Sequence, residues 1–142
     1  ITDYLADLKS QANLNLDLTD LLITSDTIVC LENTVLGKPQ NSSQAFKMIS
    51  SLSGKTHKVI TSVCLRTASK KRIFNDTTIV TFKELSKQEI EYYIEKYKPF
   101  DKAGAYGIQE WIGQIGIKKI EGSYFNVVGL PVHKLYKELM DF

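Results

Sequence analysis

The stretch that decides the fold is His57-Lys-Val-Ile-Thr-Ser-Val-Cys-Leu-Arg-Thr67, followed by Ala68-Ser-Lys-Lys71 and then Arg72-Ile-Phe-Asn-Asp-Thr-Thr-Ile-Val-Thr-Phe-Lys83. Both long segments are rich in β-branched residues, and the second alternates between two faces. A short polar connection between two such segments predicts a β-hairpin.

Other elements are predicted on both sides of this hairpin. A buried strand is expected over Leu21 to Leu31, where Asp26 interrupts an apolar run. Strands that alternate with helices around a hairpin indicate an α/β fold with a mixed sheet. Helices are expected over residues 1–12 with Thr2 as cap, over 43–52 after Asn41 or Ser42, from the capping box Ser86–Glu89 to Tyr97, and over about 131–140.

Composition limits the class of protein. A chain of 142 residues is long enough for one domain with its own core. Lys and Arg number 18 against 16 Asp and Glu, which excludes a broad basic surface for nucleic acid. There is no apolar run that could span a membrane and no signal-peptide pattern. Cys30 and Cys64 lack metal-ligand spacing, which predicts buried free thiols and favours a reducing cytoplasm.

The segment Asp101-Lys-Ala-Gly-Ala-Tyr-Gly-Ile-Gln109 has no apolar period. Its glycines let the backbone approach a ligand closely, and Lys102 and Gln109 supply hydrogen-bond donors, so it is predicted to be a binding loop. The alternative is that Asp101 and Lys102 form a surface ion pair. A second Gly-rich stretch follows from Gly113 to Tyr124. The segment from Glu121 to Asn126, continued by Val127 to Pro131, is expected to be a second loop, with ordinary turn and capping chemistry at Asn126.

Asp26 is the first candidate for chemistry, because a carboxylate inside an apolar strand is costly unless it is paired or metal-bound. It is expected to be a general base or Mg²⁺ ligand, or alternatively a strand-end carboxylate. Lys38 in Gly-Lys-Pro can reach a phosphate, or be a solvated loop lysine. Lys9 alone is typical of a solvated or snorkelling side chain. His57 and His133 have no catalytic partner at a recognisable spacing and are expected to be structural or surface residues.

Taken together and in order, these pieces resemble the Maf family of nucleotide pyrophosphatases. Any one of them is modest support, but eight in the same order are very specific. They are Lys9 in its helix, Ser25-Asp26-Thr27, Leu36-Gly37-Lys38-Pro39, the Ala45-Phe46 helix ending in Leu52-Ser53-Gly54, Thr61-Ser62-Val63, Val80 to Ser86, Asp101 to Gln109, and Ile120 to Pro131.

The resemblance implies an α/β, Maf/ITPase-like fold, a mixed twisted sheet with flanking helices and a cleft. It also implies hydrolysis of a nucleoside triphosphate between the α and β phosphates, giving the monophosphate and pyrophosphate. A divalent metal is expected, and oxygen ligands favour Mg²⁺ or Mn²⁺. The Gly-Ile-Gln sequence of the 101–109 loop is similar to that of the subgroup that acts on dTTP and UTP. Modified nucleotides are expected as further substrates.

Carried over position by position, the resemblance makes Asp26 the proton acceptor and a metal ligand. Thr27 and Gln109 match positions associated with substrate choice, and Gln109 is expected to hydrogen-bond a pyrimidine edge. A cytoplasmic homodimer is also expected, with neither nucleic acid nor membrane as partner. The lysines expected around the phosphates are Lys9, Lys38 and Lys102.

One family motif has no counterpart here, the loop Ser-x-Ser-Pro-Arg-Arg that follows the family's first strand. The chain's two arginines, Arg66 and Arg72, both belong to the predicted hairpin. We therefore expect residues 1–142 to be a single Maf-like domain lacking about 50 N-terminal residues. Because a sheet strand would be gone, the chain alone is expected to be poorly stable and weak or inactive as an enzyme. The alternatives are a catalytically inactive nucleotide-binding regulatory module and a dimerising scaffold.

Overall fold

The computed structural model describes residues 1–12 and 15–142 and is built on a five-stranded sheet with strand order β2-β1-β3-β4-β5. The predicted hairpin is confirmed, because β3 and β4 pair from Thr56 with Thr81 to Arg66 with Lys71. The strands are β1 (Leu22–Leu31), β2 (Thr34–Leu36), β3 (Thr56–Arg66), β4 (Lys71–Phe82) and β5 (Ile117–Glu121).

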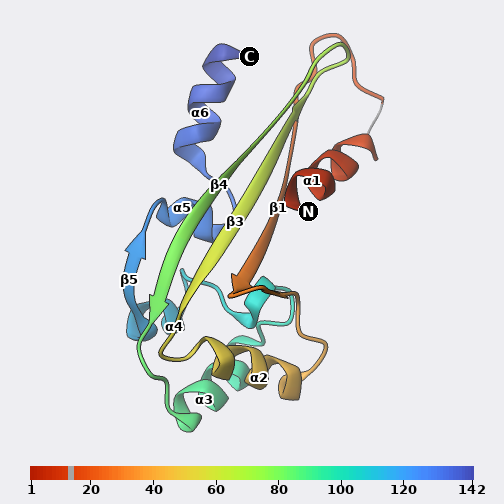
Figure 1. Ribbon diagram of the computed structural model, residues 1–142. Helices are drawn as coiled ribbons and strands as arrows, with labels where there is room; N and C mark the ends of the chain where they lie inside the picture. Colours follow the sequence, from red (N-terminus) through yellow and green to blue (C-terminus); the bar gives the residue numbers. More distant parts are fainter. Residues whose placement is uncertain (13–14) are drawn as a thin grey trace.

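The α/β class with flanking helices is confirmed, but the prediction of a mixed sheet is wrong. All four strand pairs found in the described residues are antiparallel. Parallel neighbours need a crossover along a sheet face. Here the helix between β2 and β3 lies at one end of the sheet and returns the chain to that end, so β3 runs opposite to β1 (Figure 1).

The helices begin and end close to their predicted positions where capping chemistry marks them. The Ser86 side chain accepts from the Glu89 amide at 3.1 Å, and the Glu89 carboxylate accepts from the Ser86 amide at 2.8 Å. Asn41 caps the preceding helix by accepting from the Gln44 amide at 2.9 Å. The helices are α1 (Thr2–Gln11), α2 (Ser42–Leu52), α3 (Lys87–Tyr97), α4 (Trp111–Gly116), α5 (Tyr124–Val128) and α6 (Val132–Asp141), with a 3₁₀ turn at Ala103–Ala105.

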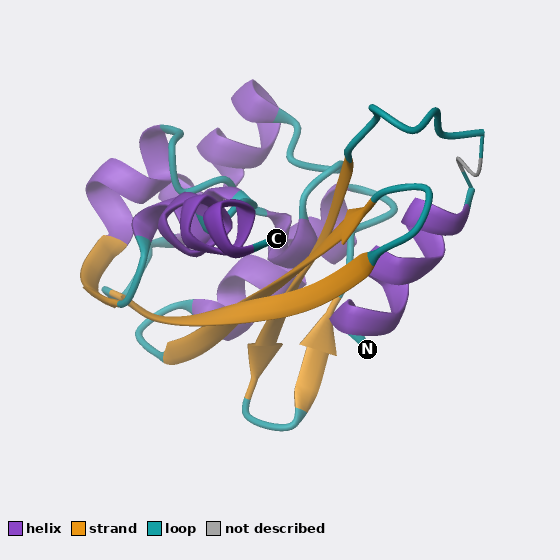
Figure 2. Ribbon diagram, turned by 90° about the horizontal axis from the view of Figure 1, so that it is seen from above, coloured by secondary structure: helices purple, strands orange, loops and turns teal. Residues whose placement is uncertain are grey.

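Helices cover both faces of the sheet, with α1 on one and α5 and α6 on the other (Figures 1 and 2). Because side chains alternate along a strand, neighbours on β3 meet different helices. The Ser62 hydroxyl donates to Thr2 of α1 at 2.6 Å, whereas Val63 packs against Leu135 of α6.

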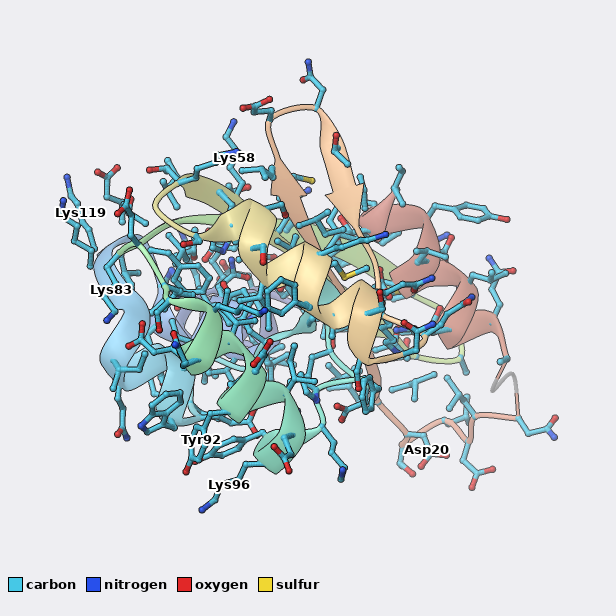
Figure 3. The ribbon with its side chains drawn as sticks, turned by 90° about the horizontal axis from the view of Figure 1, so that it is seen from below. Asp20, Lys58, Lys83, Tyr92, Lys96 and Lys119 are labelled. Atoms are coloured by element: carbon cyan, nitrogen blue, oxygen red, sulfur yellow. The ribbon has the colours of Figure 1, made fainter. Side chains whose placement is uncertain are left out.

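The main hydrophobic core lies where α2, α3 and α4 pack against the sheet, and a smaller one lies under α6. The outer side of α3 is exposed, and Tyr92 and Lys96 extend from it away from the core (Figure 3). The largest fully buried side chains include Tyr93, Phe82, Ile49, Leu52, Leu65 and Ile112.

One prediction about α1 is wrong. Thr2 is inside the helix rather than its cap, and its hydroxyl contacts Ser62. The large apolar side chains of the segment are exposed, with Tyr4 at 68% and Ile1 at 79%, whereas the small residues Ala6 and Ser10 are buried. Small side chains allow the helix to approach the sheet, and polar contacts such as the Asp7–Arg66 ion pair hold it there.

The loop predicted from Glu121 to Pro131 contains the last residue of β5 and the whole of α5, and the Gly-rich stretch from Gly113 to Tyr124 contains most of α4 and all of β5. Glycines inside α4 have low helix propensity, and six residues are too few to show a helical period. The strand β2 has only three residues and was also not predicted.

Candidate functional site

A cavity of about 340 Å³ opens between α1, β1, the loop after β2, the loop of residues 101–109, and α5. This size suits a small ligand. All six predicted site residues line it, although they come from distant parts of the chain. They are Lys9, Asp26, Thr27, Lys38, Lys102 and Gln109.

Asp26 and Lys9 form the charged pair of the cavity. The Lys9 ammonium donates to Oδ1 of Asp26 at 2.9 Å and to the Ser25 carbonyl at 2.9 Å. The Asp26 side chain is only 16% exposed and that of Lys9 54% exposed. Within the described residues no hydrogen bond engages Oδ2 of Asp26, so this oxygen is available to accept a proton.

β1 positions Asp26 and its neighbours. It pairs with β3 from Leu22 to Cys30, but with β2 only from Val29 to Leu31. The cavity therefore forms around the part of β1 that precedes its pairing with β2. This explains how adjacent residues of one strand, Asp26 and Thr27, can both line the same cavity.

The loop that carries Lys38 is joined to the 101–109 loop. The Gly104 amide donates to the Gly37 carbonyl at 3.1 Å. Gly104 has φ +71°, and a Cβ there would lie 3.0 Å from a methyl group of Val29. Glycine is needed at this position both for its backbone conformation and for the close approach to β1.

Lys102 is positioned by the rest of its loop. Its side chain crosses Gly107 so closely that a Cβ on Gly107 would lie 2.7 Å from the Lys102 Cε. The Gly107 amide donates to the buried Tyr93 hydroxyl at 3.0 Å, which donates to Glu110 at 2.6 Å. Burial raises the pKa of Tyr93, and the Glu110 carboxylate raises it further. The predicted Asp101–Lys102 ion pair is present at 3.4 Å.

An aromatic cluster forms the base of this loop. Tyr106 is buried, and its hydroxyl lies 2.6 Å from Nε2 of His57. Phe82 packs against both rings, with centroids 5.3 Å from His57 and 5.0 Å from Tyr106. Burial lowers the pKa of His57 from 6.5 to about 4 and raises that of Tyr106. His57 is thus a neutral, structural residue, as predicted.

Two residues behind the cavity had no predicted functional role, namely Thr61 and Asn126. The Thr27 and Thr61 hydroxyls lie 2.8 Å apart, and Thr61 donates to the Asn126 carbonyl at 3.0 Å. Sequence patterns could not show this contact because it depends on strand register and on α5. The expected turn chemistry belongs instead to Ser123, which caps α5.

The two arginines and His133 do not line the cavity. Arg66 pairs with Asp7 at 2.8 Å, and Arg72 pairs with Glu138 at 3.0 Å. His133 is exposed, and its Nε2 lies 4.0 Å from Asp76. Both cysteines are free thiols, with Cys64 buried and Cys30 only partly buried. No helix in the described part of the chain is long and apolar enough to cross a membrane.

Comparisons with known proteins agree on one family. The family model described as Maf-like protein matches residues 1–142. A dTTP/UTP pyrophosphatase of Christiangramia forsetii is 61% identical over 142 residues, which cover 99% of this chain and 72% of that protein. A dTTP/UTP pyrophosphatase of Flavobacterium psychrophilum is 58% identical over 142 residues, covering 99% and 73%.

A third relative, a dTTP/UTP pyrophosphatase of Porphyromonas gingivalis, is 51% identical over 142 residues, covering 98% of this chain and 71% of that protein. The matched span of 142 residues includes the segments that line the cavity. With the match of the family model to residues 1–142, it shows that this chain belongs to the Maf family.

Proposed function

We propose that this protein is a nucleoside triphosphate pyrophosphatase that acts on dTTP and UTP. The observation that carries the proposal is the partly buried Asp26 carboxylate in a cavity that is also lined by three lysines. The relatives named dTTP/UTP pyrophosphatases support the substrate. Modified nucleotides are further candidate substrates.

In the proposed reaction, Asp26 accepts a proton from a water molecule. The water oxygen then bonds to the α phosphorus, and the bond between that phosphorus and the α–β bridging oxygen breaks. The products are the nucleoside monophosphate and pyrophosphate. Lys9 orients Asp26 through its contact with Oδ1, which directs Oδ2 towards the water.

The lysines supply the positive charge that phosphoryl transfer requires. Lys9, Lys38 and Lys102 approach the cavity from α1, from the loop after β2 and from the 101–109 loop. Because these elements surround the cavity, a triphosphate between them can be neutralised from several sides. Gln109 lines the same cavity and is proposed to hydrogen-bond the pyrimidine edge.

A divalent cation, Mg²⁺ or Mn²⁺, fits the oxygen ligands of the proposed complex. Within the described residues, no three His, Cys, Asp or Glu side chains are grouped closely enough to hold a metal alone. Mg²⁺ often binds through one or two carboxylates plus substrate phosphates, so Asp26 and the triphosphate form a suitable set. Such a cation would neutralise charge on the phosphate oxygens.

We further propose a cytoplasmic homodimer. The two free thiols, Cys30 and Cys64, support a reducing compartment. The exposed apolar residues of α6, including Tyr136 and Met140, support an association surface.

The test is pyrophosphate release from dTTP and UTP by the full-length protein. Asp26→Asn should lower kcat about 10²- to 10⁴-fold, as expected for loss of a general base. Asp20→Asn, a matched change in an exposed loop outside the cavity (Figure 3), should keep wild-type activity. Nucleotide binding without pyrophosphate release would indicate a regulatory module instead. An unchanged rate in Asp26→Asn would refute its role as proton acceptor.

A further inference from the structure

The buried hydroxyl of Tyr93 fixes the position of a carboxylate next to the 101–109 loop. Tyr93 belongs to α3 and is fully buried. Its hydroxyl accepts from the Gly107 amide at 3.0 Å and donates to Oε1 of Glu110 at 2.6 Å. The bond to Glu110 is short and charge-assisted, because its acceptor is a carboxylate. It therefore sets where the negative charge of Glu110 lies.

The backbone of Glu110 is held independently of its side chain. Its amide donates to the Gly107 carbonyl at 3.0 Å, and its carbonyl accepts from the Gly113 amide at 2.9 Å. A change of rotamer can thus move the carboxylate while the backbone turn stays in place. Within the described residues, Tyr93 is the only group that donates a hydrogen bond to this carboxylate. The orientation of the Glu110 side chain therefore depends on that hydroxyl.

The Lys102 side chain passes close to the same carboxylate. A Cβ on Gly107 would lie 2.7 Å from the Lys102 Cε and 2.9 Å from Oε1 of Glu110, so both groups lie next to one point. In the described part of the chain, the Lys102 ammonium pairs with the exposed Asp101 at 3.4 Å, and no ion pair joins it to Glu110. A small movement of either side chain would bring the two opposite charges together.

We propose that Tyr93 and Glu110 are positioning residues. The Tyr93 hydroxyl holds the Glu110 carboxylate away from Lys102, which leaves the Lys102 ammonium free to bind phosphate oxygens in the cavity. An ammonium paired with Glu110 would have to give up that partner before it bound a phosphate, at a cost in affinity. Tyr93 and Glu110 do not line the cavity themselves, so both act through Lys102. This inference rests on the proposed function, in which Lys102 contacts the triphosphate.

The test uses the full-length protein and measures kcat and KM for UTP, together with the Kd of inorganic tripolyphosphate by calorimetry. Tyr93→Phe removes only the hydroxyl, so the Glu110 carboxylate can turn to Lys102. Both KM and Kd should rise about fivefold, as expected when one partly exposed ion pair must be broken, while kcat changes less than about twofold. Tyr97→Phe, on the same helix and stacked on Tyr93, is the matched control and should leave all three quantities unchanged.

A second substitution separates the effect of charge from that of packing. The double variant Tyr93→Phe/Glu110→Gln still lacks the acceptor for the Gly107 amide, but it no longer carries the carboxylate charge. Its KM and Kd should return to those of Glu110→Gln alone. In a Lys102→Gln background, Tyr93→Phe should raise neither quantity further, because there is no ammonium to occupy. A thermal melt checks that each variant folds.

A further measurement does not depend on the folding of Tyr93→Phe. With Tyr93 intact, a double-mutant cycle of Lys102→Gln and Glu110→Gln should show little coupling in the free energy of unfolding. A coupling as large as that of an ion pair would mean that the two side chains are already paired. The inference would then be wrong.

The outcomes separate this inference from the proposed function. If the wild-type protein binds tripolyphosphate but releases pyrophosphate from neither dTTP nor UTP, the proposed function fails, and the Kd values still test the role of Tyr93. If UTP is hydrolysed but folded Tyr93→Phe keeps the wild-type KM and Kd, or Glu110→Gln does not reverse its defect, only the inference fails. A higher KM for UTP with an unchanged Kd for tripolyphosphate would also overturn it, because the defect would then not concern phosphate binding.

Discussion

Two supports of the cavity, α1 and the 101–109 loop, each carry a lysine but are attached to the sheet in different ways. α1 is held largely by polar contacts. Asp7 pairs with Arg66 at 2.8 Å and with Lys71 at 3.0 Å, and the Thr24 hydroxyl donates to the Ala6 carbonyl at 2.7 Å. The loop is held by close packing over the main core, where glycines allow backbone segments to approach.

This difference predicts which changes each support tolerates. Close packing is sensitive to added volume and only weakly sensitive to salt, because it depends on contact between uncharged atoms. Ion pairs at a partly exposed surface are sensitive to charge, pH and salt, and contribute less. Lys102 should therefore be displaced by steric changes and Lys9 by electrostatic ones.

The largest effect is expected from Gly113→Ala. A Cβ on Gly113 would lie 1.8 Å from the Ile108 carbonyl oxygen, so the backbone of the 101–109 loop or of α4 must shift. Relief of such an overlap should cost more than about 3 kcal/mol of unfolding free energy. Denaturant unfolding measures this loss. Gly37→Ala is the control, because nothing lies within 4 Å of its Cβ. An equal, small loss in both variants would contradict close packing as the support of the loop.

The second-largest effect is the pH dependence of the free energy of unfolding that His57 causes at the base of the 101–109 loop. Its pKa is lowered by burial from 6.5 to about 4, so the folded protein resists protonation that the unfolded chain accepts. Between these values the unfolded state binds more protons, and the free energy of unfolding falls as pH falls. The stabilisation is complete above pH 6.5, and about 3 kcal/mol of it is lost once the pH reaches about 4.

His57→Gln cannot titrate and should remove that slope between pH 6.5 and 4. His133→Gln, at the exposed second histidine, should keep it. Denaturant unfolding at a series of pH values gives both curves. Identical slopes in wild type and His57→Gln would show that other groups are responsible.

The elements that sequence patterns predicted best are those with local signals. The capping box at Ser86 and the alternation of β4 depend on neighbouring residues, and both were confirmed. Local patterns do not show which side of α1 is buried, because its attachment depends on Asp7 meeting Arg66, a residue 59 positions away. Helical periodicity reports apolar residues and gives no signal for a helix that packs through small and charged ones.

In the candidate site too, residues with a local sequence signal were predicted and residues that depend on distant contacts were not. Asp26 was recognisable because a carboxylate interrupts an apolar strand, and Lys38 and Lys102 because they lie beside glycines in loops. Lys9 was supplied only by the resemblance, and the structure brings it to the same cavity. Thr61 and Asn126 had no such signal, since a threonine in a strand and an asparagine after a turn are ordinary residues. Their contact appears only when the register of β1 with β3 and the position of α5 are known.

The smallest effect is expected from Asp7→Asn, which weakens the attachment of α1. Hydrogen bonds from Lys71 and Arg66 help to lower the pKa of Asp7 below 3.8. Its stabilisation is therefore present above that pH and is lost as pH falls through the lowered pKa. At neutral pH the variant should have a slightly lower melting temperature and a higher KM for UTP, because Lys9 is on the same helix.

Both differences should shrink at high salt, and the difference in melting temperature should disappear as the pH falls through the lowered pKa of Asp7. Asp141→Asn, on the exposed end of α6, is the matched change of charge and should leave both quantities unchanged. If salt left the effect of Asp7→Asn intact, α1 would be held by packing as the loop is, and the contrast between the two supports would fail. A salt-sensitive KM with a salt-insensitive Gly113→Ala defect would instead establish that the two lysines reach the cavity on physically different supports.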